Sequence, residues 1–259
     1  SVKESDLIKG VNELAKRSES RGKDSSGIAI LNENLRNIDV FKSPYPITNL
    51  IKKNIVADSI RRGFLKNNFI KLAFGHSRLV TNGTQLSGYN NQPIVKDKSI
   101  CIHNGIIVNH NNLWKKYPIL KKEYEIDTEV LLAIINYKIK LNIDPLDKII
   151  SDSVNEVFGT IATAILLTNL KKFVLTTNNG SLYTVKNKND YIFFASEMSI
   201  MNAFSKKIGL HKKQEFEIEQ LNPNTGIIID LYNFSFKKFN YGSSDKKINS
   251  ESINTKSIS

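Results

Sequence analysis

The sequence has little of the chemistry that cross-links small domains or holds metal ions. Its 259 residues include a single cysteine, which excludes an intramolecular disulfide, and four histidines that are scattered without Cys/His spacing. Because metal sites in proteins need several such ligands at characteristic spacings, we predict that the protein binds no metal. We also predict no cofactor.

Long apolar runs are absent as well. No segment approaches the roughly 18 apolar residues that a membrane-spanning helix needs. Residues 1–6 are polar and lack the apolar core of a secretory signal. We therefore predict a cytoplasmic protein with no membrane partner.

Acidic residues are scarcer than basic ones, so the formal net charge is +12. A concentrated basic face attracts nucleic acids. Here the lysines instead form short pairs along the whole chain, such as Lys52-Lys53 and Lys171-Lys172. This spread is typical of solvated lysines, and we expect no nucleic-acid partner. A basic nucleic-acid-binding protein stays open as an alternative, which strongly salt-dependent binding would reveal.

Length and composition favour one domain followed by a tail. A chain of this length with 40% hydrophobic residues can bury one substantial core. We place the domain at residues 1–240. Residues 241–259 are rich in Ser, Asn and Lys and cannot bury enough apolar surface to order themselves, so we expect a disordered tail or a linker.

The hydrophobic pattern changes twice along the chain. An N-terminal helix, capped by Ser5 or Asp6 and ended by Gly22, leads into strands at 27–31, 38–41, 69–74 and 100–102. Helices are expected at 109–114, from 127, and at 144–157. Further strands follow at 161–167, 173–177, 182–185, 192–195, 216–218 and 227–231. This order predicts layered sheets and helices rather than a regular βαβ alternation.

Three fragments carry a more specific signal: Arg21-Gly22-Lys23-Asp24-Ser25-Ser26-Gly27, Gly75-His76-Ser77-Arg78-Leu79-Val80-Thr81-Asn82-Gly83 and Cys101-Ile102-His103-Asn104-Gly105. In this order they resemble the glutamine-hydrolysing domain of class II glutamine amidotransferases, a branch of the N-terminal-nucleophile hydrolases. Within that family, the fragments Asp127-Thr128-Glu129-Val130 and Ala195-Ser196-Glu197 resemble most the glutaminase domain of glucosamine-6-phosphate synthases. The resemblance implies an α+β fold, a four-layer αββα sandwich.

The resemblance also implies a reaction. Family members hydrolyse L-glutamine with an N-terminal cysteine, whose free α-amine serves as base, and pass the ammonia to a synthase partner. Asn104 and Gly105 match the family's oxyanion hole. The chain lacks the nucleophile, and we expect it on a Cys-Gly strand upstream of Ser1, so that the chain as given is inactive. A non-catalytic module that binds glutamine or glutamate is the alternative reading.

The substrate pocket is assigned from the same resemblance. Arg78 matches the arginine that holds the substrate carboxylate, and Asp127 matches the carboxylate that pairs with the ammonium group, although a helix-capping role for Asp127 is equally open. Thr81 and Asn82 are expected to line the pocket. The residues expected to support the site are Arg21, Asp24, Ser25, His76 and His103.

The chain departs from the family at two positions. Gln92 replaces the histidine of an Asn-x-His-Pro turn, and Leu79 replaces a tryptophan that helps cover the site and guide ammonia. The acceptor is therefore open, with a sugar-phosphate synthase favoured, and the oligomeric state is open too, a homo-oligomer included. Cys101 and Ser1 are not expected to be nucleophiles: Cys101 lies in an apolar strand, and no apolar strand follows Ser1.

Overall fold

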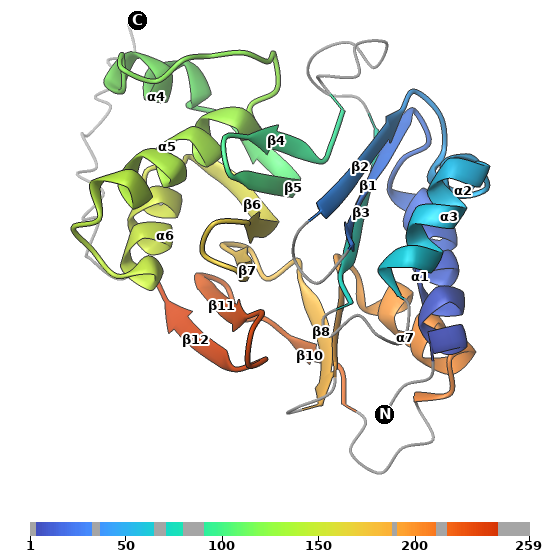
Figure 1. The fold of residues 1–259 in the computed structure, drawn as a ribbon. Coiled ribbons are helices and arrows are strands. Elements are labelled where there is room, and N and C mark those ends of the chain that lie inside the picture. Colours follow the sequence, from blue (N-terminus) through green and yellow to red (C-terminus); the bar gives the residue numbers. More distant parts are fainter. Residues whose placement is uncertain are drawn as a thin grey trace, which may run out of the picture.

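The fold is a sandwich of four layers (Figure 1). The computed structural model describes residues 4–32, 37–64, 71–79, 91–187, 191–210 and 217–242. A layer of helices covers two small sheets, these face a larger sheet, and a second layer of helices covers the outer face of the larger sheet. The predicted α+β, αββα architecture is confirmed.

The first helical layer packs on the small sheets. It contains α1 (Glu4–Ser18), η1 (Glu19–Arg21), α2 (Ile47–Ile51), α3 (Asn54–Gly63) and α7 (Met198–Lys207). Apolar side chains of α1, α2 and α3 form one cluster with Ile28 and Ile30 of β1, because alternate residues of a strand point to the same face. A second cluster joins Met201 and Phe204 of α7 to Val185 of β8.

The two small sheets each have three antiparallel strands. One has the order β2-β1-β3 and consists of β1 (Ser25–Asn32), β2 (Asn37–Ser43) and β3 (Ala73–Arg78). The other has the order β10-β8-β9 and consists of β8 (Tyr183–Asn187), β9 (Tyr191–Ala195) and β10 (Glu219–Gln220). Strands β3 and β9 are therefore end strands, each with one neighbour among the described strands.

The larger sheet has six antiparallel strands in the order β12-β11-β7-β6-β5-β4. They are β4 (Ile94–Lys96), β5 (Ser99–Ile107), β6 (Gly159–Leu167), β7 (Lys172–Thr177), β11 (Thr225–Asp230) and β12 (Phe236–Asn240). The outer helices are α4 (His110–Lys116), α5 (Thr128–Leu141) and α6 (Leu146–Asn155). Residues 128–136 of α5 are all buried, because this helix lies between the sheet and the other outer helices.

Strand alternation in β5 separates two cores. Ile100 and Ile102 face the small sheets and join a cluster with Phe74 and Phe173. Cys101 and Ile107 face the outer helices and join the cluster around α5. The same alternation directs His103 toward α5 and Asn104 toward the small sheets, so consecutive residues of one motif serve opposite faces of the sheet.

Several sequence expectations need correction. Helices α2, α3 and α7 and strands β4 and β12 were not expected, and β10 lies at Glu219–Gln220 rather than 216–218. Ser5 and Asp6 lie inside α1, which already begins at Glu4, so neither is its cap. The expected strand at 69–74 is β3, which starts at Ala73 and runs through the Gly75-His76-Ser77-Arg78 motif instead of ending before it.

The C-terminal end of the described chain packs against the larger sheet. Tyr241 is buried beside Phe239, and the Thr176 side chain hydrogen-bonds its hydroxyl at 3.0 Å. Residues 243–259, most of the expected tail, lie outside the described residues. In the part of the chain that is described, no helix has the length and apolar character that crossing a membrane requires.

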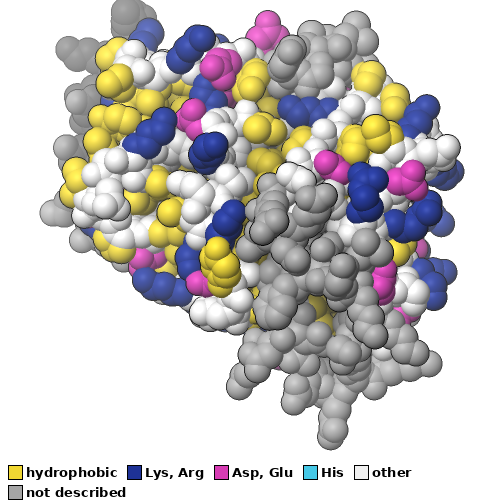
Figure 2. Space-filling view, in the orientation of Figure 1, with side chains coloured by type: hydrophobic (Ala, Val, Ile, Leu, Met, Phe, Trp, Pro, Cys, Tyr) yellow, Lys and Arg dark blue, Asp and Glu magenta, His cyan; other side chains and the backbone are white. Residues whose placement is uncertain are grey.

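Charged side chains are mixed on the surface. On the face drawn in Figure 2, Lys and Arg side chains are spread among acidic and apolar ones rather than gathered in one block. Many pair with a nearby carboxylate, as Lys116 and Lys138 do with Glu156. Carboxylates therefore neutralise part of the positive charge locally, through ion pairs.

Candidate functional site

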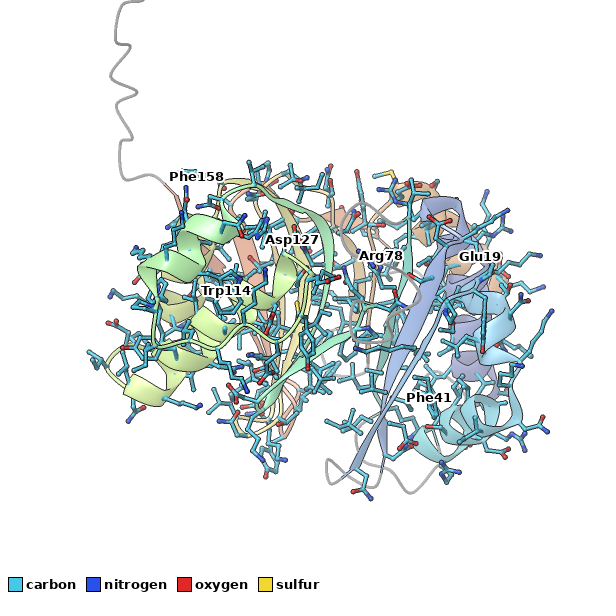
Figure 3. All side chains as sticks on the ribbon, turned by 90° about the horizontal axis from the view of Figure 1, so that it is seen from above. Glu19, Phe41, Arg78, Trp114, Asp127 and Phe158 are labelled. Atoms are coloured by element: carbon cyan, nitrogen blue, oxygen red, sulfur yellow. The ribbon has the colours of Figure 1, made fainter. Side chains whose placement is uncertain are left out.

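Arg78 and Asp127 come from different layers and lie in the middle of the molecule (Figure 3). Arg78 ends β3, Asp127 immediately precedes α5, and both are buried. Burial lowers the pKa of Arg78, and the nearby carboxylates of Asp127 and Asp24 raise it against this effect. A buried cation and a buried anion are thus held within electrostatic reach of each other.

Asn104 and Gly105 lie inside β5, paired with Ala162 and Ile161 of β6. The sequence placed them after a strand, and this is wrong because the strand continues through the motif to Ile107. Gly105 has φ +147°, and a Cβ there would lie 2.0 Å from the Thr160 carbonyl oxygen. Only glycine fits this position, and its backbone stays exposed while the strand remains paired.

His103 is locked in one tautomer by its neighbours. Its Nε2 lies 3.0 Å from the carbonyl oxygen of Thr160, which can only accept, so Nε2 carries the proton. Its Nδ1 lies 2.9 Å from the Thr128 hydroxyl, which must then donate. Burial lowers the pKa of His103 in spite of the nearby Asp127 carboxylate, so the ring stays neutral and braces β5 against α5.

Asp127 fixes the far end of the same strand. Its Oδ2 accepts a hydrogen bond of 2.6 Å from the backbone N–H of Ile107. It makes no side-chain capping bond to α5, so the helix-cap alternative is wrong. Within the described part of the chain, its Oδ1 has only a 3.4 Å contact with the Thr128 hydroxyl, and that hydroxyl proton points to His103. One carboxylate oxygen therefore holds β5, and the other has no contact as short among the described residues.

The loop that precedes Asp127 is held by a buried ion pair that the sequence did not predict. Glu129 is fully buried, and its carboxylate accepts bonds from Lys96 Nζ at 2.7 Å and from the backbone N–H groups of Glu123 and Tyr124 at 2.8 Å. These bonds hold the loop that leads into Asp127. An acid at the third position of the fragment Asp127-Thr128-Glu129 was visible in the sequence, but its distant partner Lys96 was not.

The Asn91-Gln92 pair contacts both halves of the site. The side-chain oxygen of Asn91 lies 3.5 Å from Arg78 Nη1, and the side-chain amide of Gln92 bonds both backbone groups of His103. Both residues are buried, and the Gln92–Pro93 peptide bond is cis. The sequence identified Gln92 only as a departure from the family turn.

The Arg21–Ser25 segment packs against the end of β3. A Cβ on Gly22 would lie 2.1 Å from the backbone nitrogen of Leu79, so this glycine allows the close approach. The Asp24 N–H donates to the Arg78 carbonyl at 3.2 Å, and Ser25 pairs with Arg78 across the sheet. Arg21 forms a 2.6 Å ion pair with Glu197, near the start of α7. The segment therefore connects the end of β3 to the start of α7.

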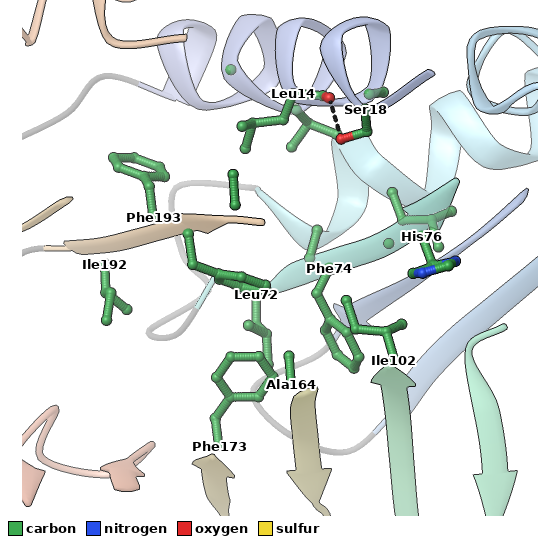
Figure 4. A pocket seen from close by; sticks show the side chains of 18 of the residues that line it. Leu14, Ser18, Leu72, Phe74, His76, Ile102, Ala164, Phe173, Ile192 and Phe193 are labelled. Atoms are coloured by element: carbon green, nitrogen blue, oxygen red, sulfur yellow. Dashed lines mark hydrogen bonds between the residues drawn. The ribbon is translucent and has the colours of Figure 1, made fainter. Parts of the chain in front are cut away.

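A cavity of about 790 Å³ reaches from the Asn104 end of β5 along the small sheets (Figure 4). Helix α1 lies on one side of it and strands β5, β6 and β7 on the other, with β3 and β9 along its flanks. Its walls are mostly apolar and include Leu14, Leu72, Phe74, Ile102, Ala164, Phe173, Ile192 and Phe193. The cavity thus lies in the layer of the small sheets, between their two end strands.

Some residues that line this cavity have buried polar atoms without partners. Among the described residues, His76 Nδ1 and Ser77 Oγ are buried with no hydrogen-bond partner, and both residues line the cavity. Burial, reinforced by His103, Arg78 and Arg21, lowers the pKa of His76 to about 3. Such groups are costly unless a further molecule or segment satisfies them.

Comparison with known proteins shows which family the sequence belongs to. Residues 76–203 match a family model described as "Glutamine amidotransferase domain". The chain is 30% identical over 213 residues to glutamine–fructose-6-phosphate aminotransferase (isomerizing) of Helicobacter pylori, covering 78% of this chain and 31% of that protein. It is also 30% identical over 217 residues to the protein of the same name from Clostridium acetobutylicum, covering 82% and 32%.

This chain carries a class II glutamine amidotransferase domain. The amidotransferase domain spans about a third of the length of the curated relatives it matches. Its fold is similar to that of glutamine phosphoribosylpyrophosphate amidotransferase from B. subtilis, with a TM-score of 0.64, 18% identity, and coverage of 92% of this chain and 47% of that chain. At this identity the structural likeness supports the N-terminal-nucleophile fold alone.

Two expected details of the amidotransferase domain, at Cys101 and Leu79, can be compared with the structure. Cys101 is buried in the apolar cluster around α5, and burial raises the pKa of its thiol, which agrees with a packing role. Leu79 is exposed beside Arg78. Thr81 and Asn82 lie outside the described residues, as does Ser1.

Proposed function

We propose that the domain hydrolyses the side-chain amide of L-glutamine to L-glutamate and ammonia, using a cysteine supplied by a segment outside residues 1–259. The observation that supports this proposal is that the buried guanidinium of Arg78 lies within electrostatic reach of the Asp127 carboxylate, which bonds β5 at Ile107, two residues after Gly105. A free α-amino acid has one carboxylate and one ammonium group, and this pair of charges matches both.

The charges favour a free amino acid over a peptide. The Arg78 guanidinium can grip a carboxylate with two parallel N–H donors, which a lysine cannot do. The Asp127 oxygen that is not bonded to Ile107 can accept from an ammonium group. A peptide bond at either end of the glutamine would remove one of these charges, so we propose that the pocket selects free glutamine.

The reaction follows from the groups around β5. The α-amine of the cysteine, with an ordinary pKa of about 7.7 to 8.0, takes the thiol proton, and the thiolate attacks the side-chain amide carbon. The Asn104 amide and the Gly105 N–H donate to the oxyanion that forms. Collapse of this intermediate breaks the C–N bond, the departing nitrogen takes the proton, and water hydrolyses the γ-glutamyl thioester to glutamate.

The cavity supports a site for the strand that carries the cysteine. End strands β3 and β9 both line it, and each has a strand partner on one side only within the described residues. An unpaired strand edge is a ready template for another strand. We propose that a Cys-Gly strand fills the cavity, pairs with these edges and satisfies the polar atoms of His76 and Ser77.

The ammonia acceptor is proposed from the relatives. The matched proteins are named as glutamine–fructose-6-phosphate aminotransferases, and this chain spans only about a third of their length. We propose that the ammonia goes to a sugar-phosphate synthase domain or partner. In that case the domain contributes one half-reaction to amino-sugar synthesis.

The decisive experiment measures glutamate and ammonia released by the chain beginning at Ser1 and by the protein with its native upstream segment. We expect a trace rate from the first and full turnover from the second, because an oxyanion hole without a nucleophile assists water only weakly. Replacing the upstream cysteine with alanine is the control. An upstream sequence without cysteine, combined with intact glutamate binding, would favour a regulatory module, and equal rates would return Ser1 or Cys101 to consideration.

A synthetic peptide provides a second test of the strand site. A peptide matching the native upstream segment should bind the chain beginning at Ser1, raise its melting temperature and slow amide exchange in β3 and β9. A peptide of the same composition in scrambled order is the control. Binding without protection of both strands would contradict the proposed position.

A further inference from the structure

Gln92 lies opposite His103 of β5, just beyond the last backbone pair between β4 and β5. Strands β4 and β5 pair in an antiparallel register in which Ile94 faces Cys101 and Lys96 faces Ser99. Extending this register by two residues places Gln92 opposite His103. The backbone pairing stops at Ile94, but the Gln92 side chain continues it: its Nε2 donates to the His103 carbonyl at 2.8 Å, and its Oε1 accepts from the His103 N–H at 2.6 Å.

The side-chain amide therefore replaces one backbone pair of the sheet. An amide offers one donor and one acceptor, the same two functions that a facing residue contributes in an antiparallel ladder. Both bonds are buried, so they are shielded from competing water. The neighbouring residues Ile102 and Asn104 have backbone groups that point to the other edge, where they pair with Ala164 and Ala162 of β6. Gln92 thus fixes both backbone groups of His103, the residue immediately before Asn104.

We infer that Gln92 is a positioning residue for the oxyanion hole, which it orients through the backbone of His103. This inference rests on the proposed glutaminase function. Asp127 holds the strand at Ile107 and Gln92 holds it at His103, so the two bonds bracket Asn104 and Gly105. Without the Gln92 clamp, the nearest tethers on this edge are the pairing of Cys101 with Ile94 and the bond from Ile107 to Asp127. The longer free span lets the Asn104 donor lose its alignment with the developing oxyanion.

The turn itself does not depend on the Gln92 side chain. The backbone oxygen of Gln92 packs so closely on β1 that a Cβ at Gly27 would lie 2.2 Å from it. Asn91 is anchored separately beside Arg78. Replacing the side chain should therefore loosen β5 without displacing the Arg78 half of the site, which makes the inference testable by kinetics.

The experiment uses the full protein with its native N-terminal cysteine and the variants Gln92→Leu and Gln92→Glu. Leu removes both bonds at similar size, and Glu keeps the acceptor for the His103 N–H while losing the donor. We expect kcat to fall roughly tenfold to a hundredfold for Leu and less for Glu, with KM changed less than about threefold. Gln220→Leu, which removes one side-chain bond to the Gly180 carbonyl, is the matched control and should leave both constants unchanged.

Two further measurements separate the possible failures. Amide exchange at His103 should become faster in Gln92→Leu, even in the chain beginning at Ser1, while glutamate affinity by calorimetry stays within about threefold. Unchanged kcat in Gln92→Leu would overturn the inference, as would equal losses of kcat and glutamate affinity. If the wild-type protein shows no glutaminase activity, the proposed function fails, and faster exchange at His103 still tests the clamp by itself.

Discussion

Asp127 Oδ2 accepts a hydrogen bond of 2.6 Å from the backbone N–H of Ile107, so the residue proposed to bind the substrate ammonium also holds the strand that carries the oxyanion donors. The two functions use different oxygens of one carboxylate. Because α5 begins at Thr128, the position of Asp127 is set by a buried helix rather than by a loop alone. This coupling makes substitutions at Asp127 informative about both functions.

Asp127→Asn should weaken the binding of glutamate and glutamine without unfolding the protein. The amide oxygen can still accept from Ile107, but the charge that pairs with the substrate ammonium is lost. Losing one partner of a desolvated charge pair costs about 2 to 5 kcal/mol. Calorimetric titration of glutamate into the variant should therefore show an affinity lower by more than about tenfold, with a nearly unchanged melting temperature.

Arg78→Lys is the companion variant at the other end of the ligand. It keeps the charge but loses the two-pronged donor and the contact with Asn91, so affinity should fall here too. Lys116→Ala, which removes an exposed ion pair with Glu156, is a control for general loss of charge. Wild-type affinity in both Asp127→Asn and Arg78→Lys would remove these residues from the pocket.

The sequence predicted the fold class and most of the large sheet, because those strands and α5 have strong apolar patterns. It did not predict the geometry of the site. The strand pattern in β5 is interrupted by polar residues at His103 and Asn104, and only the pairing with β6 shows that the strand continues. The bonds of Gln92 to His103 and of Lys96 to Glu129 join residues 11 and 33 positions apart, so local sequence carries no signal for them.

His76 should make the free energy of unfolding decrease as the pH is lowered from about 6.5 to about 3. The unfolded chain protonates this histidine near its ordinary pKa of 6.5, whereas the folded chain does so only near pH 3. Between these values the unfolded state binds more protons, so the free energy of unfolding decreases as pH falls. Denaturation at pH 7 and pH 4.5 should show a smaller loss in His76→Asn than in wild type. His110→Asn, at a histidine on α4, should keep the wild-type loss.

Gly105→Ala should destabilise the protein far more than an ordinary glycine substitution. Its new Cβ would lie 2.0 Å from the Thr160 oxygen and 2.7 Å from His103 Nε2, so β5 and β6 would have to separate. Gly209→Ala is the matched control, because Gly209 also has a positive φ, +75°, but no atom within 4 Å of its Cβ position. Both variants carry backbone strain of about 1 to 3 kcal/mol, and only Gly105→Ala adds the clash. Equal losses in urea denaturation would mean that the strand tolerates a side chain at 105.

Asn104→Ala tests the oxyanion role in the protein with its native upstream cysteine. Residue 104 faces the space between the sheets and lines the cavity, while its backbone pairs with Ala162, so truncation of the side chain leaves the strand intact. The amide donor acts mainly on charge that develops in the transition state. Turnover of glutamine should therefore fall by roughly two orders of magnitude, whereas KM changes modestly. Steady-state assay of glutamate release measures both constants.

Asn155→Ala, at the end of α6, provides a control of the same chemistry outside the site. If Asn104→Ala retained wild-type turnover, the donor to the oxyanion would have to come from another residue, and the reading of the whole motif would change with it.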